Sequence, residues 1–250
     1  MGMGNDVTRV LPFFLKGGPR HRPGTHWEYW NQGYALASEI VARASGKPYT
    51  EYCREALFAP AKMAATRFTG DEPPEGFTVA VGQSSHGKPR SALAHPYGNE
   101  YGFQYRGMGG AVCSVWDLWR WDRALRFDHP APLLGAKSRA ELFKPGLKEC
   151  ALGWYVAMDK HGRWVQSHGG SVRGFACEVR RYPDHDGCLF VLSNRDDAPV
   201  RELTEGVQGI LFGDPDELKV APRPLTGDTL NAIIGEYIDT IKPDGPRLRA

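Results

Sequence analysis

The sequence has few cysteines, almost no net charge and no long apolar run, and each of these shortages excludes a class of protein. No apolar stretch approaches the roughly 20 residues that a transmembrane helix needs. The cysteines are odd in number and form no C-x-x-C pair, which argues against a disulfide framework and against a zinc site. They are Cys53, Cys113, Cys150, Cys177 and Cys188. A formal net charge of +2 gives no reason to expect a nucleic acid or a membrane surface as partner.

The start of the chain, from Met1 to Asn5, has neither the basic residues nor the apolar core of a signal peptide. We therefore expect a soluble protein, and the compartment stays open. With 250 residues, of which 41% are hydrophobic and 24% charged, the chain is long enough for one domain with a sizeable core. Proline is frequent between Gly213 and Thr226, which predicts a domain over 1–213 and a linker with the start of a truncated C-terminal segment over 214–250.

The stretch from Pro23 to Met63 carries the first candidate site residues. Tyr29 and Asn31 lie two positions apart, so in an extended segment their side chains point the same way. Apolar residues at helical spacing follow them and predict a helix that ends at Gly46. A tyrosine in a cleft more often only finds a partner for its hydroxyl, and it acts as a base only where nearby cations lower its pKa from about 10.

A second candidate segment lies far along the chain and reads His168-Gly169-Gly170-Ser171. The residues from Arg163 to His168 favour a short strand, and the glycines after it would let another backbone or a ligand come close. A histidine at a strand end is, taken alone, more often only solvated. Tyr29 and His168 therefore gain weight as site residues only in combination.

The remaining elements follow from periodicity, turn residues and caps. Ser114 is expected to cap a helix from Val115 to Arg126, with Asp117 completing a capping box. The other expected helices are Val7–Phe14, Tyr49–Phe58, Ser138–Phe143 and Val200–Phe212. The expected strands are Thr78–Gly82, Ala151–Ala157, Phe175–Tyr182 and Cys188–Leu192, the last two joined by a turn at Pro183–Gly187.

These segments together resemble the serine β-lactamase and penicillin-binding-protein superfamily, above all class C β-lactamases, D-alanyl-D-alanine carboxypeptidases and related esterases. Such enzymes carry Ser-x-x-Lys, then Tyr-x-Asn, then Lys-Thr-Gly or a His-x-Gly variant. Tyr29-Trp30-Asn31 matches the second motif and His168-Gly169-Gly170 the third, while 107–118 resembles a Gly-Gly…Ser…Asp-Leu segment. The resemblance covers roughly 6–212. It implies an α/β (α+β) fold of the β-lactamase/transpeptidase type, with an antiparallel sheet flanked by helices.

The resemblance also implies a chemistry, in which a serine attacks an ester, a D-Ala peptide or a β-lactam and an acyl-enzyme forms. Tyr29 would shuttle the proton, and Asn31 would hydrogen-bond the substrate amide. His168 would stand where a lysine helps to bind a substrate carboxylate, which favours esters or peptides over penicillins. Gly169 and Gly170 would contact the substrate, and the backbone N–H of Ser171 would form half of an oxyanion hole. No cofactor and no metal is implied.

The sequence departs from this family at the first motif, because none of the 28 residues before Tyr29 is a serine. We therefore expect the N-terminal strands and the nucleophile helix to be missing, and the chain to be inactive by itself. Ser85-His86-Gly87-Lys88 is a literal Ser-x-x-Lys, but its glycine and the following proline disfavour the helix that the motif needs, and it comes after Tyr29.

Alternatives remain open. The chain is either a hydrolase fragment, a non-catalytic relative that binds peptidoglycan-like or acyl ligands, or a remnant. His21 with His26, and the turn at 184–186, contain metal-ligand types without a third ligand at recognisable spacing. Without N-terminal strands, the strand Cys188–Leu192 would present an apolar edge, which predicts self-association or poor solubility.

Overall fold

The computed structural model describes Pro12, residues 16–84, 87–95, 104–126 and 132–213, and the backbone of two short strands near the C-terminus. Contacts divide the chain into two units, 1–205 and 206–250. In the second unit, β9 (Glu236–Tyr237) pairs antiparallel with β10 (Leu248–Arg249). The expected helix at 7–14 and the expected linker at 213–226 lie almost wholly outside the described residues.

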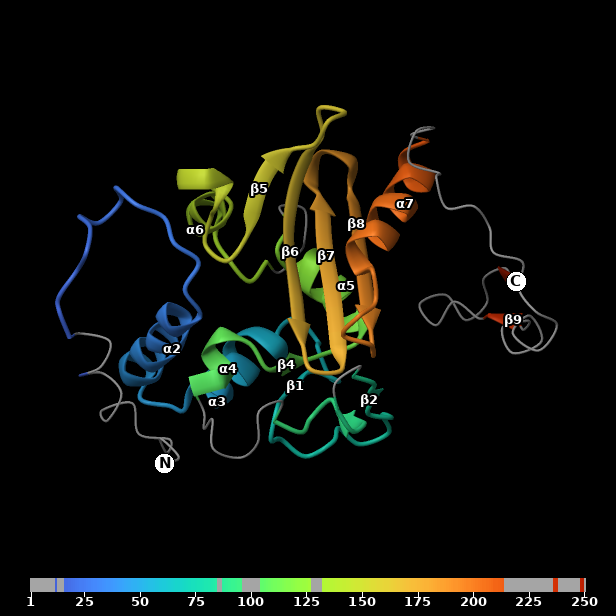
Figure 1. Ribbon diagram of the computed structural model, residues 1–250, viewed down its shortest axis with the longest axis horizontal. Coiled ribbons are helices and arrows are strands. Elements are labelled where there is room, and N and C mark those ends of the chain that lie inside the picture. The colour runs from blue at the N-terminus through green and yellow to red at the C-terminus, as the bar shows by residue number, and fades with distance from the viewer. Residues whose placement is uncertain are drawn as a thin grey trace. The chain divides into compact units, whose positions relative to one another are not determined.

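A four-stranded antiparallel sheet, in the order β5-β6-β7-β8, forms the centre of the first unit (Figure 1). Its strands are β5 (Tyr155–Met158), β6 (Trp164–Val172), β7 (Phe175–Tyr182) and β8 (Gly187–Ser193). Each strand follows its neighbour through a short turn, so that the sheet is a meander. The expected antiparallel sheet with flanking helices is confirmed.

Two strand boundaries differ from the sequence expectation in ways that concern the site. The strand expected to end at His168 continues to Val172, because Gly169 to Val172 pair with β7. His168 is therefore an interior residue of β6 and not a strand-end residue. The strand expected from Ala151 begins only at Tyr155, since a turn with Gly153 at φ 81° precedes it.

The helices before the sheet begin with α2 (Asn31–Ser45), which ends as expected at Gly46 in the left-handed conformation, φ 69°. The expected helix at 49–58 is two elements, α3 (Tyr49–Cys53) and a π-helical segment, η1 (Arg54–Phe58). In the π-helical part the N–H of Ala59 bonds to the carbonyl of Arg54, 2.8 Å away. α4 (Gln104–Met108) was not expected from the sequence.

α4 packs against α2 at a glycine (Figure 1). A Cβ on Gly107 would lie 2.3 Å from Ser38 Oγ and 2.9 Å from the carbonyl oxygen of Tyr34. No side chain fits in this space. Gly107 therefore allows the backbones of the two helices to approach closely, which fixes the start of α2 and the residues just before it.

α5 (Val115–Ala124) lies against the sheet on the side away from the viewer in Figure 1. The Oγ of Ser114 accepts a hydrogen bond from Asp117 N at 3.1 Å, which confirms the expected N-cap. The reciprocal half of the capping box is absent among the described contacts. The Asp117 carboxylate, fully buried, instead accepts from Ala65 N and Thr66 Oγ1 at 2.9 and 2.8 Å.

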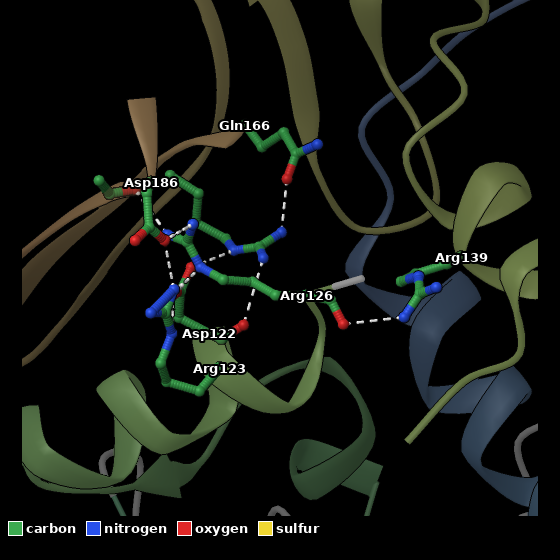
Figure 2. A network of polar contacts seen from close by, with 8 residues as sticks. Asp122, Arg123, Arg126, Arg139, Gln166 and Asp186 are labelled. Carbon is green, nitrogen blue, oxygen red and sulfur yellow. Dashed lines mark hydrogen bonds and ion pairs between the residues drawn. The ribbon is translucent and has the colours of Figure 1, made fainter. Parts of the chain in front are cut away.

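A buried network of charged groups joins α5 to the sheet (Figure 2). The Asp122 carboxylate accepts from Arg126 Nε at 2.6 Å and from Arg181 Nε on β7 at 2.7 Å. Arg181 also donates to Gln166 on β6, the residue two positions before His168. The network thus ties the strand that carries His168 to the helical part of the unit.

The remaining described elements are two helices, two 3-10 turns and four short strands. α6 (Ala136–Leu142) begins at Gly135, so that Ser138 lies inside this helix and does not start it. α7 (Val200–Phe212) has the expected bounds. The 3-10 turns are η3 (Leu147–Glu149) and η4 (Pro183–His185), and the two-residue strands are β1 (Arg67–Phe68), β2 (Val81–Gly82), β3 (Arg90–Ser91) and β4 (Ala111–Val112). Within the residues described, no helix is both long and apolar enough to cross a membrane.

Candidate active site

The structure brings the two candidate motifs together. The rings of Tyr29, just before α2, and His168, within β6, have their centroids 6.4 Å apart at 36°. The two residues are separated by most of the first unit in sequence. Asn31 is exposed at the first position of α2, and its side chain makes no hydrogen bond with the described residues.

The backbone around Tyr29 explains its position. Trp30 is the residue before the helix and is extended, with φ −143° and ψ 99°, so that the chain enters α2 from a straight segment. The Tyr29 side chain is 56% exposed despite its aromatic ring. An exposed phenol beside a histidine is accessible to a ligand, as a buried one would not be.

The edge of β6 next to this pair is open. β5 pairs with β6 only from Trp164 to Ser167, so that among the described strands His168 to Val172 pair on one side alone, with β7. Gly169, Gly170 and Ser171 are exposed. Such an edge presents backbone N–H and C=O groups to which an extended ligand can add as a further strand.

His168 has a defined ring orientation. Its Nδ1 lies 2.7 Å from the carbonyl oxygen of Gly169. A carbonyl only accepts, so Nδ1 carries the hydrogen, and in the neutral ring Nε2 is the nitrogen able to accept a proton. The backbone of the motif thus prepares the imidazole as a base or hydrogen-bond acceptor.

Tyr155 lies beside His168, Tyr34 lies near Tyr29, and Cys150 contacts Tyr155; none of the three was expected as a site residue from the sequence. The ring of Tyr155, on β5, lies 5.9 Å from the His168 ring. Burial raises the pKa of Tyr155, and burial likewise raises the pKa of Tyr34 on α2, whose hydroxyl meets the turn at Gly153. Burial also raises the pKa of the Cys150 thiol, which hydrogen-bonds to Trp27 and Tyr155. These groups stay protonated near neutral pH.

The sequence contained only a faint signal for these residues. Tyr155 lies in a predicted strand, but strand periodicity does not say which strand is its neighbour. Tyr34 lies in a predicted helix, and helical spacing does not say which turn its hydroxyl contacts.

The two histidines considered above as metal ligands, His21 and His26, contact each other through their rings. His21 and His26 stack, with ring centroids 4.0 Å apart. Within the described part of the chain no group of three or more histidine, cysteine, aspartate or glutamate side chains is arranged to hold a metal ion. The cysteines of the described residues are all free thiols.

The fold and the paired motifs define a protein of the β-lactamase/transpeptidase type. Over residues 4–210 the chain matches the Beta-lactamase family, and it belongs to this family. It is 27% identical over 234 residues to a penicillin-binding protein of Bacillus subtilis (strain 168), covering 86% of this chain and 51% of that protein. It is 22% identical over 161 residues to a D-aminopeptidase of Brucella anthropi, covering 62% of this chain and 29% of that protein.

Among solved structures, the octameric penicillin-binding protein homologue from Pyrococcus abyssi has a TM-score of 0.67 at 20% identity, with 92% of this chain and 53% of that chain covered. This likeness shows the fold. The chain spans about half the length or less of these relatives. The family and fold expected from the sequence are confirmed, and the chain is a serine-hydrolase-like member of this family with a D-aminopeptidase among its relatives.

Proposed function

We propose that the surface formed by Tyr29 and the open edge of β6 binds esters or peptides, including amides of D-amino acids, in the manner of an acyl-transfer enzyme. The observation that carries the proposal is the placement of the Tyr29 and His168 rings, 6.4 Å apart, beside a strand edge open from His168 to Val172. A D-aminopeptidase among the relatives supports the substrate class.

The residues take distinct roles in this proposal. Where a nucleophile is supplied, Tyr29 passes a proton between it and the leaving group, and His168, with Nε2 as acceptor, assists Tyr29. Asn31 hydrogen-bonds the substrate amide, and Gly169 and Gly170 offer backbone groups to it. The N–H of Ser171 contributes half of an oxyanion hole. A neutral imidazole is a poor partner for a substrate carboxylate, which favours esters and peptides over β-lactams.

We further infer that the 250 residues bind such a ligand without turning it over. The covalent step requires a serine with a neighbouring lysine, and no serine precedes Tyr29. Loss of the nucleophile alone typically reduces the rate by several orders of magnitude. Reaction of the chain with a fluorophosphonate should therefore leave it unlabelled. A stoichiometric label would contradict this inference, and Ser85, outside the described residues, is the first position to map.

Calorimetric titration with N-acetyl-D-phenylalanine amide, a neutral ligand, tests the binding site. We expect saturable binding that Tyr29→Phe weakens about five- to tenfold, since a lost hydrogen bond costs roughly 1 kcal/mol. Tyr52→Phe, which removes a hydroxyl from a partly exposed tyrosine on α3, is the matched control and should bind as the wild type does. Absence of saturable binding, or equal affinity in all three proteins, would exclude the proposed site.

A further inference from the structure

Glu178, on β7, is the charged residue whose carboxylate lies over Gly169. β6 and β7 lie side by side in the sheet (Figure 1). The two residues are direct partners in their antiparallel pairing, so side chains at these positions share one face of the sheet. A Cβ on Gly169 would lie 2.6 Å from Glu178 Oε2, which is too close for real atoms. Glu178 therefore fills the space that a side chain at position 169 would need.

The carboxylate is only partly compensated. Arg180 Nε donates to Oε1 at 3.3 Å, whereas Oε2 is the oxygen that borders Gly169 and accepts no hydrogen bond from the described residues. Arg180 Nη2 also lies 3.6 Å from Glu205 on α7, so that one guanidinium is shared by two carboxylates. The side chains of Glu178 and Arg180 are only 15% and 12% exposed, where solvent weakens a charge less than at an open surface.

The position of this charge matters because Gly169 lies on the open part of β6. A ligand that extends the sheet there places its groups alternately on the two faces. One of these groups comes to lie beside Gly169, on the face of Glu178. No protein side chain at position 169 separates it from the carboxylate.

We propose that Glu178 is a specificity-determining residue of the open edge of β6, which favours a ligand with an ammonium group beside Gly169 and disfavours one with a carboxylate there. The inference rests on the proposed function, since it takes the open edge of β6 as the ligand site. It adds a substrate class, namely compounds of D-amino acids that carry a free amino group and no free carboxylate.

Three ligands on one scaffold test the charge preference in the unmodified chain. They are D-phenylalanine amide, which is cationic, N-acetyl-D-phenylalanine amide, which is neutral, and N-acetyl-D-phenylalanine, which is anionic. In the wild type we expect the affinity to fall in this order. Glu178→Gln should shrink the ratio between cationic and anionic ligands about tenfold, as a charge interaction of roughly 1.4 kcal/mol would.

Glu205→Gln is the matched control, because it removes a carboxylate from the same arginine without touching the space over Gly169. It should leave the ratio within about twofold of the wild type, well short of the tenfold change expected of Glu178→Gln. Glu178→Asp, which keeps the charge on a shorter side chain, should retain most of the preference and guards against a folding defect in Glu178→Gln.

The outcomes separate the two proposals. If Tyr29→Phe weakens binding but Glu178→Gln leaves the charge ratio unchanged, the role of Glu178 is overturned and the site stands. If Glu205→Gln changes the charge ratio as much as Glu178→Gln does, the role of Glu178 is also overturned, since the effect would then come from the net charge of the region. If none of the three ligands binds, the proposed function fails and the role of Glu178 fails with it.

Discussion

The thiol of Cys113, between β4 and α5, shows what burial does to a single residue. Burial raises its pKa to about 12, with smaller contributions from Cys177 and Asp117. Because the folded pKa lies above the usual value, the thiol stabilises the fold fully below about pH 9, and this contribution is lost as the pH rises towards 12. The free energy of unfolding in urea should therefore fall by about 2 kcal/mol more in wild type than in Cys113→Ala between pH 8 and pH 10.5.

The comparison of pH slopes removes the cost of the substitution itself, which is the same at both pH values. Burial also raises the pKa of Cys188 to about 11 and that of Tyr182 to about 12, so both proteins should lose stability in alkali. Only the excess loss in wild type belongs to Cys113. Identical slopes would show that burial does not raise the pKa of this thiol.

At the scale of elements, Asp122 connects α5 with β7. Its carboxylate is 1% exposed and accepts from Arg126 and Arg181. Among the described residues, Asp122→Asn therefore leaves the buried guanidinium of Arg181 without a counter-charge and leaves Arg126 with Asp186 alone. We expect a loss of about 3 kcal/mol in unfolding free energy, since removal of one member of a buried ion pair is strongly destabilising. Urea denaturation followed by circular dichroism measures it.

Asp186→Asn is the control for this change. Asp186 bonds to Arg123 and Arg126 at the outer end of the same network, but its side chain is 69% exposed (Figure 2). Its φ of 48° is tolerated by asparagine. The loss should stay within about 1 kcal/mol, as for other exposed pairs. A comparable loss in both variants would mean that burial does not set the strength of the network.

The same network marks the limit of prediction from sequence. Phe175–Tyr182 and Val200–Phe212 were predicted with the bounds that β7 and α7 have, because alternation and helical spacing are local signals. Asp122 and Arg181 lie 59 positions apart, and nothing local in either residue points to the other. The close packing of α4 on α2 at Gly107 was missed for the same reason.

The candidate site likewise contains residues that local motifs predict and residues that only the folded sheet brings together. Tyr29, Asn31 and His168-Gly169-Gly170 could be named as candidates because motifs are contiguous in sequence. Tyr155 and Glu178 approach His168 and Gly169 only through strand pairing, and the register of that pairing is a property of the folded sheet. His168 was placed at a strand end because two glycines suggested that the strand stops, whereas pairing with β7 carries it on.

At the scale of the whole molecule, we predict that the chain self-associates through the outer edge of β8. From Cys188 to Leu192 the described structure pairs β8 with β7 alone, and only beyond it does Gln83 N bond to the carbonyl of Asn194, at 2.7 Å. Leu192 is 40% exposed on this apolar strand. An unpaired apolar edge invites pairing with a second strand, and a second copy of this chain offers an identical one.

Sedimentation velocity at micromolar concentration should therefore show dimers or larger species. Leu192→Lys places a charge at this edge, as natural edge strands do, and should shift the chain towards monomer. Ile210→Lys, which adds the same charge at a residue 67% exposed on α7, should leave the distribution unchanged. A monomeric wild type would show that the edge of β8 is not accessible to a partner strand. If Leu192→Lys and Ile210→Lys dissociate the dimers equally, the effect comes from net charge and the edge of β8 is not the interface.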